Sequence, residues 1–165
     1  VQGATRALSA ARHRGIPAVL DADISDDPNA LQAVKSATHV VFSEQGLSTI
    51  LHTADPVEGL RLAAQHAPFV AVTLGAKGVM WMGEAGDICT LDAYPVKAQE
   101  TLGAGDVFHG AFALALAEGQ PVEGALRFAS VTAALKCERS GGRATFPDRA
   151  EVDAALRPSQ EPVRA

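Results

Sequence analysis

The sequence has 165 residues, of which 47% are hydrophobic, 20% charged and 5% aromatic. This balance predicts one compact domain with a core of small aliphatic side chains. The 14 Lys and Arg residues against 19 Asp and Glu residues give a net charge of -5 without a basic cluster, which argues against nucleic acid as a partner.

Membrane and cysteine signals are also weak. No apolar run approaches the roughly 20 residues that span a bilayer, and residues 1–15 follow the pattern of an amphipathic helix rather than of a signal peptide. Cys89 and Cys137 are too few for a disulfide framework and lack metal-ligand spacing. We therefore expect a cytoplasmic protein that is not bound to a membrane.

Helical and strand patterns alternate through residues 1–75. Apolar residues at helical spacing predict helices over residues 4–11, 26–37, 44–54 and 56–67. Short continuous apolar runs predict strands over residues 18–23, 38–43 and 69–75, the first of which ends in acidic residues. In the second helix, Asp26 or Asp27 is the predicted cap, with Pro28 in the first turn.

The pattern changes after residue 75. Glycines and short alternating stretches over residues 75–98 predict a hairpin or meander at the edge of the sheet, and three helices are predicted over residues 107–118, 122–138 and 149–156. The whole order predicts an α/β fold in which a mostly parallel sheet lies between two helix layers. Residues 1–157 form the predicted domain, and residues 158–165 form a polar tail.

One short stretch, Gly103, Ala104, Gly105 and Asp106, precedes a strongly apolar helix. Backbone N–H groups at a helix N-terminus lack partners within the helix and lie at the positive end of its dipole, so small residues there let an anion approach the backbone. The same field keeps Asp106 ionised, as a proton acceptor. The simpler interpretation is a tight turn whose aspartate caps the helix.

An anion site beside a carboxylate is what phosphoryl transfer to an alcohol needs. Fixed donors meet the charge that spreads over the transferring oxygens, and an acidic side chain orients the attacking hydroxyl and accepts its proton. The stretch therefore indicates a phosphotransferase, whereas a dinucleotide-binding oxidoreductase is excluded because no G-x-G-x-x-G motif follows the first strand.

The stretch ETLGAGDVFHGAF, residues 100–112, resembles the C-terminal signature of the PfkB or ribokinase-like carbohydrate kinases. AVTLGAKGVMWM, residues 71–82, resembles the strand-loop-strand that contacts nucleotide phosphates in that family. Residues 15–25 and 38–50 resemble the preceding strands of the family, and the helices that flank residues 136–147 resemble its adenine-side segment. The resemblance thus covers almost the whole chain.

This resemblance implies a ribokinase-like three-layer α/β/α sandwich and an enzyme that phosphorylates a hydroxyl of a small sugar with ATP. It implies that Asp106 is the catalytic base and that the amides of Gly103, Ala104, Gly105 and Asp106 form an anion hole. The residues that it implies for nucleotide binding are Ser43, Thr73, Gly75, Gly78 and Gly105.

Two departures from the family pattern concern ions. Where many members have an Asn-x-x-Glu motif tied to magnesium and phosphate, this chain has Ser43 and Gly46, so Glu44 is the predicted Mg²⁺ contact, through water. Glu100 stands where the family usually has Asp, in a monovalent-cation site formed with the loop over residues 137–145. The longer side chain leaves activation by K⁺ open.

Members of the family are nearly twice as long as this chain, and their sugar-contacting residues and lid come mainly from the N-terminal half. We therefore expect a C-terminal portion that lacks this N-terminal part and lid, and that shows little or no sugar phosphorylation by itself. The alternative is a non-catalytic ribokinase-like module that binds a nucleotide or a partner chain. The sugar, the hydroxyl attacked and a homodimer are all left open.

Overall fold

The computed structural model describes residues 1–157, apart from the side chain of Arg143; the predicted polar tail, residues 158–165, lies outside the described residues. Its centre is a five-stranded sheet in the order β1-β2-β3-β4-β5. The strands are β1 (Val19–Ala22), β2 (His39–Ser43), β3 (Phe69–Thr73), β4 (Val79–Met82) and β5 (Ile88–Leu91).

The direction of the strands divides the sheet into two parts. β1, β2 and β3 run parallel, whereas β4 pairs antiparallel with β3, and β5 with β4. The antiparallel strands form the meander that the glycine-rich pattern predicts at the sheet edge. The three parallel strands finish at the same end of the sheet, and α/β proteins usually bind their ligands beyond the carboxyl ends of such strands.

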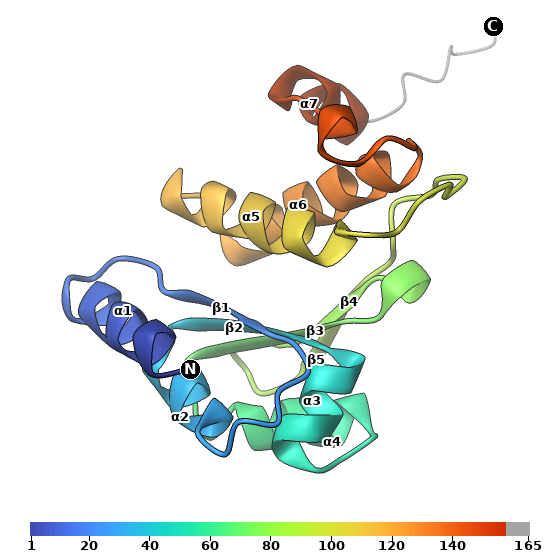
Figure 1. Ribbon diagram of the computed structural model, residues 1–165. Helices are drawn as coiled ribbons and strands as arrows, with labels where there is room; N and C mark the ends of the chain where they lie inside the picture. Colours follow the sequence, from blue (N-terminus) through green and yellow to red (C-terminus); the bar gives the residue numbers. More distant parts are fainter. Residues whose placement is uncertain (158–165) are drawn as a thin grey trace, which may run out of the picture.

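Helices cover both faces of the sheet, as Figure 1 shows. The helices on one face are α1 (Gln2–His13), α2 (Ala30–Ser36), α3 (Glu44–Leu51) and α4 (Pro56–Ala63). Those on the other side are α5 (Ala104–Ala117), α6 (Val122–Cys137) and α7 (Arg149–Leu156). Short 3₁₀ helices, η1 (Gly75–Lys77) and η2 (Gly142–Thr145), complete the described elements. The fold is the three-layer α/β/α sandwich that the sequence predicts.

The alternation of side chains along β2 explains why both faces need cover. Val40 and Phe42 belong to the core under α1 to α4, whereas Val41 belongs to the core under α5 to α7. All three are 0% exposed. A strand that is buried on both faces has a continuous apolar run, which is how residues 38–43 are identified from sequence.

Three helix starts differ from the predictions. α1 begins at Gln2, two residues before the predicted range. α2 begins at Ala30 with Asn29 as its cap, because Asp27 instead accepts a hydrogen bond from the Asn29 backbone N–H (2.8 Å) in a turn of its own. α5 begins at Ala104, three residues earlier than predicted, because Gly103 adopts the left-handed conformation (φ 77°) that lets the helix start there.

Among the described residues, no helix has the length and apolar character needed to cross a bilayer.

Gly46, in the first turn of α3, lies directly against the chain that leaves β1. A Cβ atom at position 46 would lie 2.0 Å from the Ala22 carbonyl oxygen and 2.9 Å from the Asp23 carbonyl carbon. Both are backbone atoms that cannot rotate away. This contact gives a physical reason for glycine at the position where the resemblance leads one to expect glutamate.

We predict that Gly46→Ala destabilises the chain by about 3 kcal/mol, the upper end for an overpacked site, because helix α3 must move away from β1. Denaturant unfolding of the purified chain measures the change. Gly3→Ala is the matched control, since a Cβ at position 3 meets no atom within 4 Å. Equal stability of the two variants would contradict this account of the α3 packing.

Candidate functional site

The candidate site lies where the carboxyl ends of β1, β2 and β3 meet the N-terminus of α5. The His109 imidazole on α5 joins the two parts, because its Nε2 lies 3.2 Å from the Val41 carbonyl oxygen in β2 and 3.3 Å from Asp21 Oδ1 in β1. Figure 1 shows the start of α5 and η1 at this same end of the sheet. The fold therefore brings together segments that lie far apart in the sequence.

Helix α5 starts in a way that exposes its first amides. The Gly103 backbone is left-handed and serves as the N-cap, and the Asp106 carboxylate lies over it, with Oδ2 3.9 Å from the position of a Cβ on Gly103. A Cβ on Gly105 would meet no atom within 4 Å. The space in front of this helix end is therefore open to a ligand.

The prediction that all four amides are open is wrong for Ala104. Its N–H donates to the Thr101 carbonyl (3.1 Å), which closes the turn that precedes the helix. In the described part of the chain, the amides of Gly103, Gly105 and Asp106 have no protein acceptor. Three of the four predicted donors therefore remain available to an anion.

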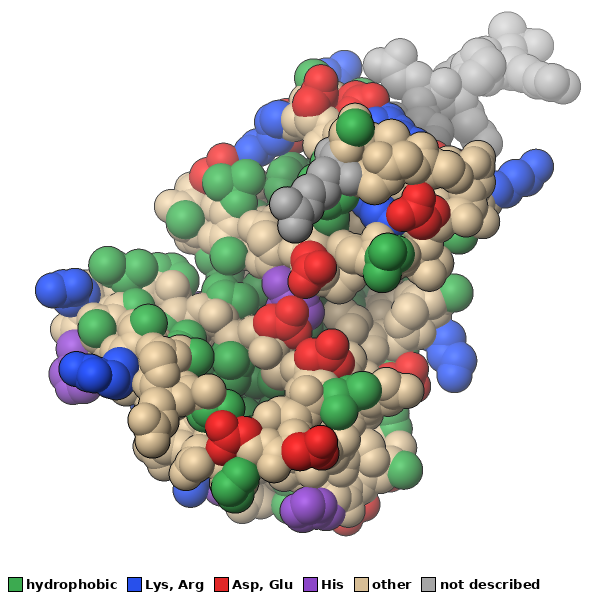
Figure 2. Space-filling model, viewed as in Figure 1, with side chains coloured by type: hydrophobic (Ala, Val, Ile, Leu, Met, Phe, Trp, Pro, Cys, Tyr) green, Lys and Arg blue, Asp and Glu red, His purple; other side chains and the backbone are tan. Residues whose placement is uncertain are grey.

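Acidic side chains and one histidine line the face below α5, as Figure 2 shows. Burial raises the pKa of Asp21, the His109 charge opposes this rise, and the nearby Asp23 and Asp106 charges add to it. Asp21, Asp23 and His109 are not among the site residues predicted from sequence. The acids that end the first predicted strand are the signal that could have pointed to the first two.

Ser43 connects two elements at the carboxyl end of β2. Its hydroxyl accepts a hydrogen bond from the Gly46 N–H (2.9 Å) and so caps α3, and it donates to Asp23 Oδ1 (2.7 Å). The Ser43 hydroxyl bond, with a smaller contribution from the Ile24 N–H, lowers the pKa of Asp23. The predicted contact of Ser43 with a nucleotide stays a prediction.

The loop between β3 and β4 holds the other predicted nucleotide contacts. Thr73 pairs with Ser43 across β2 and β3, and its hydroxyl donates to the Phe42 carbonyl (3.3 Å). Gly75 is exposed and left-handed (φ 57°). Gly78 is buried, donates its N–H to the Gly75 carbonyl, and leaves no room for a Cβ, which would lie 2.0 Å from the Leu91 carbonyl oxygen. Gly78 therefore shapes the loop.

The two predicted ion contacts lie in different surroundings. Glu44 is exposed in the first turn of α3. Within residues 1–157, no group of three or more His, Cys, Asp or Glu side chains is arranged to hold a metal ion. Glu100 lies between two partners, Lys136 Nζ at 3.8 Å and the Gly141 N–H at 3.1 Å.

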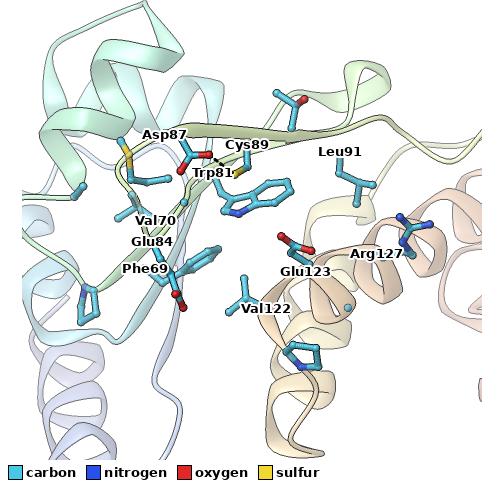
Figure 3. Close-up of a pocket in the computed structure, with 17 residues that line it drawn as sticks. Phe69, Val70, Trp81, Glu84, Asp87, Cys89, Leu91, Val122, Glu123 and Arg127 are labelled. Carbon is cyan, nitrogen blue, oxygen red and sulfur yellow. Dashed lines mark hydrogen bonds between the residues drawn. The ribbon is translucent and has the colours of Figure 1, made fainter.

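A cavity of about 1290 Å³ opens elsewhere, between the sheet edge and the start of α6. Figure 3 shows Phe69, Trp81 and Cys89 on the strand side and Glu123 and Arg127 on the helix side. Phe69 begins β3, so this cavity lies toward the opposite end of the sheet from Thr73. None of the predicted site residues lines it.

A smaller cavity, of about 340 Å³, begins at Asp106 itself. It runs along α5 past Leu114 and is closed on the other side by Phe128 and Phe146. Asp106 therefore lies between an apolar groove and the acidic face described above.

Comparisons with known proteins identify the family and the fold. Residues 2–149 match the pfkB family carbohydrate kinase domain. A solved putative ribokinase of Agrobacterium tumefaciens is 39% identical, with a TM-score of 0.86 over 93% of this chain and 51% of its own. The Arabidopsis thaliana ribokinase, solved with ribose and ATP, is 28% identical, with a TM-score of 0.83 over 94% of this chain and 52% of its own.

A third similar structure contains a monovalent ion. It is a double mutant of Vibrio cholerae fructokinase in a form that binds fructose, ADP and a potassium ion; it is 26% identical, with a TM-score of 0.79 over 92% of this chain and 54% of its own. The chain thus spans about half the length of the solved structures that it matches. Its fold is the ribokinase-like one.

We predict that Ser43→Ala lowers stability by about 1 kcal/mol at neutral pH, because α3 loses its cap and Asp23 loses its hydroxyl donor. The folded-state pKa of Asp23 is depressed, so its contribution is present above the unfolded pKa and is lost as the pH falls through the folded pKa. The difference in free energy of unfolding between wild type and Ser43→Ala should therefore become smaller as the pH falls into the acidic range.

Urea unfolding across the acidic range measures this difference. Ser48→Ala, also on α3, loses a hydroxyl away from the cap and serves as the control. If Ser43→Ala matched Ser48→Ala at neutral pH, Ser43 would not fix α3 to the end of β1.

Proposed function

We propose that this chain, which belongs to the pfkB family of carbohydrate kinases, is the nucleotide-binding and catalytic-base portion of an enzyme that transfers the terminal phosphate of ATP to a hydroxyl of a small sugar. The observation that carries the proposal is the start of α5, where three open amides lie beside an exposed carboxylate. The ribose and ATP in the Arabidopsis thaliana ribokinase structure support a sugar and ATP as substrates.

Asp106 is the proposed base. It lies in the first turn of α5, and its exposed carboxylate is able to accept a proton from a substrate hydroxyl. In phosphoryl transfer the attacking hydroxyl loses its proton late, and the carboxylate first orients it toward the phosphorus atom. Asp106 borders an open groove and is free to meet a sugar hydroxyl.

The amides of Gly103, Gly105 and Asp106 are the proposed anion hole. Charge grows on the phosphate oxygens during transfer, and fixed N–H donors at a helix N-terminus stabilise that charge without reorganising. Ala104 contributes through its small size rather than its amide, which the Thr101 carbonyl already occupies. The absence of side chains at positions 103 and 105 lets the phosphate reach the backbone.

The remaining predicted contacts belong to the nucleotide. Thr73, Gly75 and Ser43 lie at the carboxyl ends of β2 and β3, on the same edge of the sheet as the start of α5, and we assign them to the phosphates, with Gly78 holding the shape of the loop. Bound Mg²⁺ would neutralise phosphate charge, and it commonly keeps several waters. Glu44 is the proposed protein contact, through one of these waters.

We predict that Asp106→Asn lowers kcat by at least about 10²-fold, the range for loss of a general base, because the amide cannot accept the proton. ATP affinity should change little. The assay uses the longest natural protein that contains this chain, with ribose and fructose as acceptors, because the 165-residue chain lacks the length of its relatives.

Asp87→Asn is the control for this experiment, since Asp87 lines the cavity between the sheet edge and α6. Turnover by Asp106→Asn equal to that of the control would refute the role of Asp106 as base. ATP binding without phosphorylation of any sugar by the wild type would instead favour the non-catalytic module.

We further predict that Gly105→Val weakens binding of Mg-ATP to the chain by at least about tenfold, because its side chain would fill the space in front of the open amides. Gly3→Val, in α1, is the control away from the site, since a Cβ at position 3 or 105 meets no neighbouring atom within 4 Å. Calorimetric titration measures both affinities, and thermal melting checks that both variants fold. Equal affinities would place the phosphates away from α5.

A further inference from the structure

Lys136 is a fully buried charged residue near the end of α6. The residue is 0% exposed, and its ammonium group donates to the carbonyl oxygens of Glu100 (3.0 Å) and Leu102. The Glu100 carboxylate lies 3.8 Å from the same Nζ atom. A buried ammonium is costly unless it is paired and hydrogen-bonded, so these three oxygens form a built site for a cation.

Two segments enclose this ammonium. The backbone amides of Gln99 and Glu100 both donate to the Cys137 carbonyl, at 2.7 and 3.1 Å. The second oxygen of the Glu100 carboxylate accepts the Gly141 N–H at 3.1 Å. The residues that precede α5 are thus fastened to the loop that follows α6, with the positive charge between them.

This is the place where the sequence resemblance implies a monovalent-cation site, formed by Glu100 and the loop over residues 137–145. Carbonyl and carboxylate oxygens are suitable ligands for a potassium ion. However, the residues present do not fit a free ion, because a covalently attached ammonium already donates to these oxygens. Lys136 and a potassium ion would compete for the same ligands with like charges at short distance.

We propose that the Lys136 ammonium permanently replaces a bound monovalent cation in this chain, so that its fold and its site work without potassium. The potassium ion in the similar Vibrio cholerae fructokinase structure supports the contrast, since this chain carries its own cation. That the fold is independent of potassium does not require kinase activity. That turnover is independent of potassium rests on the proposed kinase function.

The ammonium also acts on the candidate anion hole. The Leu102 carbonyl, which accepts from the Lys136 ammonium, belongs to the residue directly before the Gly103 N-cap. The Asp106 amide, in the first turn of α5, has no acceptor within the helix. Lys136 is therefore a positioning residue that fixes the turn before Gly103 while the Asp106 amide stays open.

The test compares thermal unfolding of the chain in potassium chloride and in choline chloride at equal ionic strength. Wild type should melt at the same temperature in both. Lys136→Ala should melt lower in choline and recover by at least about 4 °C in potassium, saturably, because the vacated oxygens then accept the ion. Lys136→Met keeps a long side chain that fills the space between these oxygens without a charge. Potassium should therefore not raise the melting temperature of this variant.

Lys97→Ala is the matched control, because it loses the same charge from an exposed position near Glu100. Lys97→Ala should melt at the same temperature in potassium chloride and in choline chloride. Thallium-205 NMR of the wild type adds a readout that does not depend on the variants folding, and we expect no bound signal that potassium displaces. Selective stabilisation of the wild type by potassium, a displaceable thallium signal, or a folded Lys136→Ala that melts alike in both salts would overturn the proposal.

Turnover separates this inference from the kinase proposal. In an active kinase containing this chain, the rates in potassium and choline should agree within about twofold for the wild type, and a potassium requirement would overturn the inference. A protein without activity would defeat the proposed function alone, because the melting and thallium experiments need neither ATP nor sugar.

Discussion

The candidate site depends on how helix α5 begins. A helix normally leaves its first amides without intrahelical partners, and the chain that leads into it decides whether they are covered. Here the left-handed backbone of Gly103 turns the chain, and the Ala104 amide closes that turn by donating to the Thr101 carbonyl. The Lys136 ammonium donates to the Leu102 carbonyl, just before the turn. The three amides left open are the donors that we propose for the phosphate anion.

The sheet supplies the other half of the site. Because β2 is buried on both faces, its register is fixed, and its carboxyl end must lie beside those of β1 and β3. That arrangement puts Asp21 and Asp23 below the start of α5, and His109 reaches down to meet Asp21 at 3.3 Å. The acids and the open amides thus lie on one edge because of apolar packing elsewhere in the molecule.

Local signals explain what could be predicted from sequence. The continuous apolar run over residues 38–43 identifies a strand buried on both faces, and Asp55 followed by Pro56 identifies the start of α4. The sequence pattern places the start of α5 three residues too late because the first residues of the helix carry no apolar pattern; the left-handed Gly103 shows where it begins. The open amides around Gly105 follow from the motif itself.

Contacts between distant segments explain what could not be predicted. The Asp21 and His109 pair joins positions 88 residues apart, and no local pattern links them. Lys136 interrupts an apolar helix, and a lysine is normally expected at the surface, so only the structure reveals its ammonium among the Glu100 and Leu102 oxygens. A buried ammonium is costly to leave without its oxygen partners, so this contact constrains the loop before α5.

The most direct test of the central claim is a crystal structure of the chain with Mg²⁺ and a non-hydrolysable ATP analogue. The account predicts terminal phosphate oxygens about 3 Å from the backbone nitrogens of Gly105 and Asp106, with the Asp106 carboxylate on the side from which a sugar hydroxyl would attack. A terminal phosphate bound away from the start of α5, with these amides facing water or a protein acceptor, would contradict it.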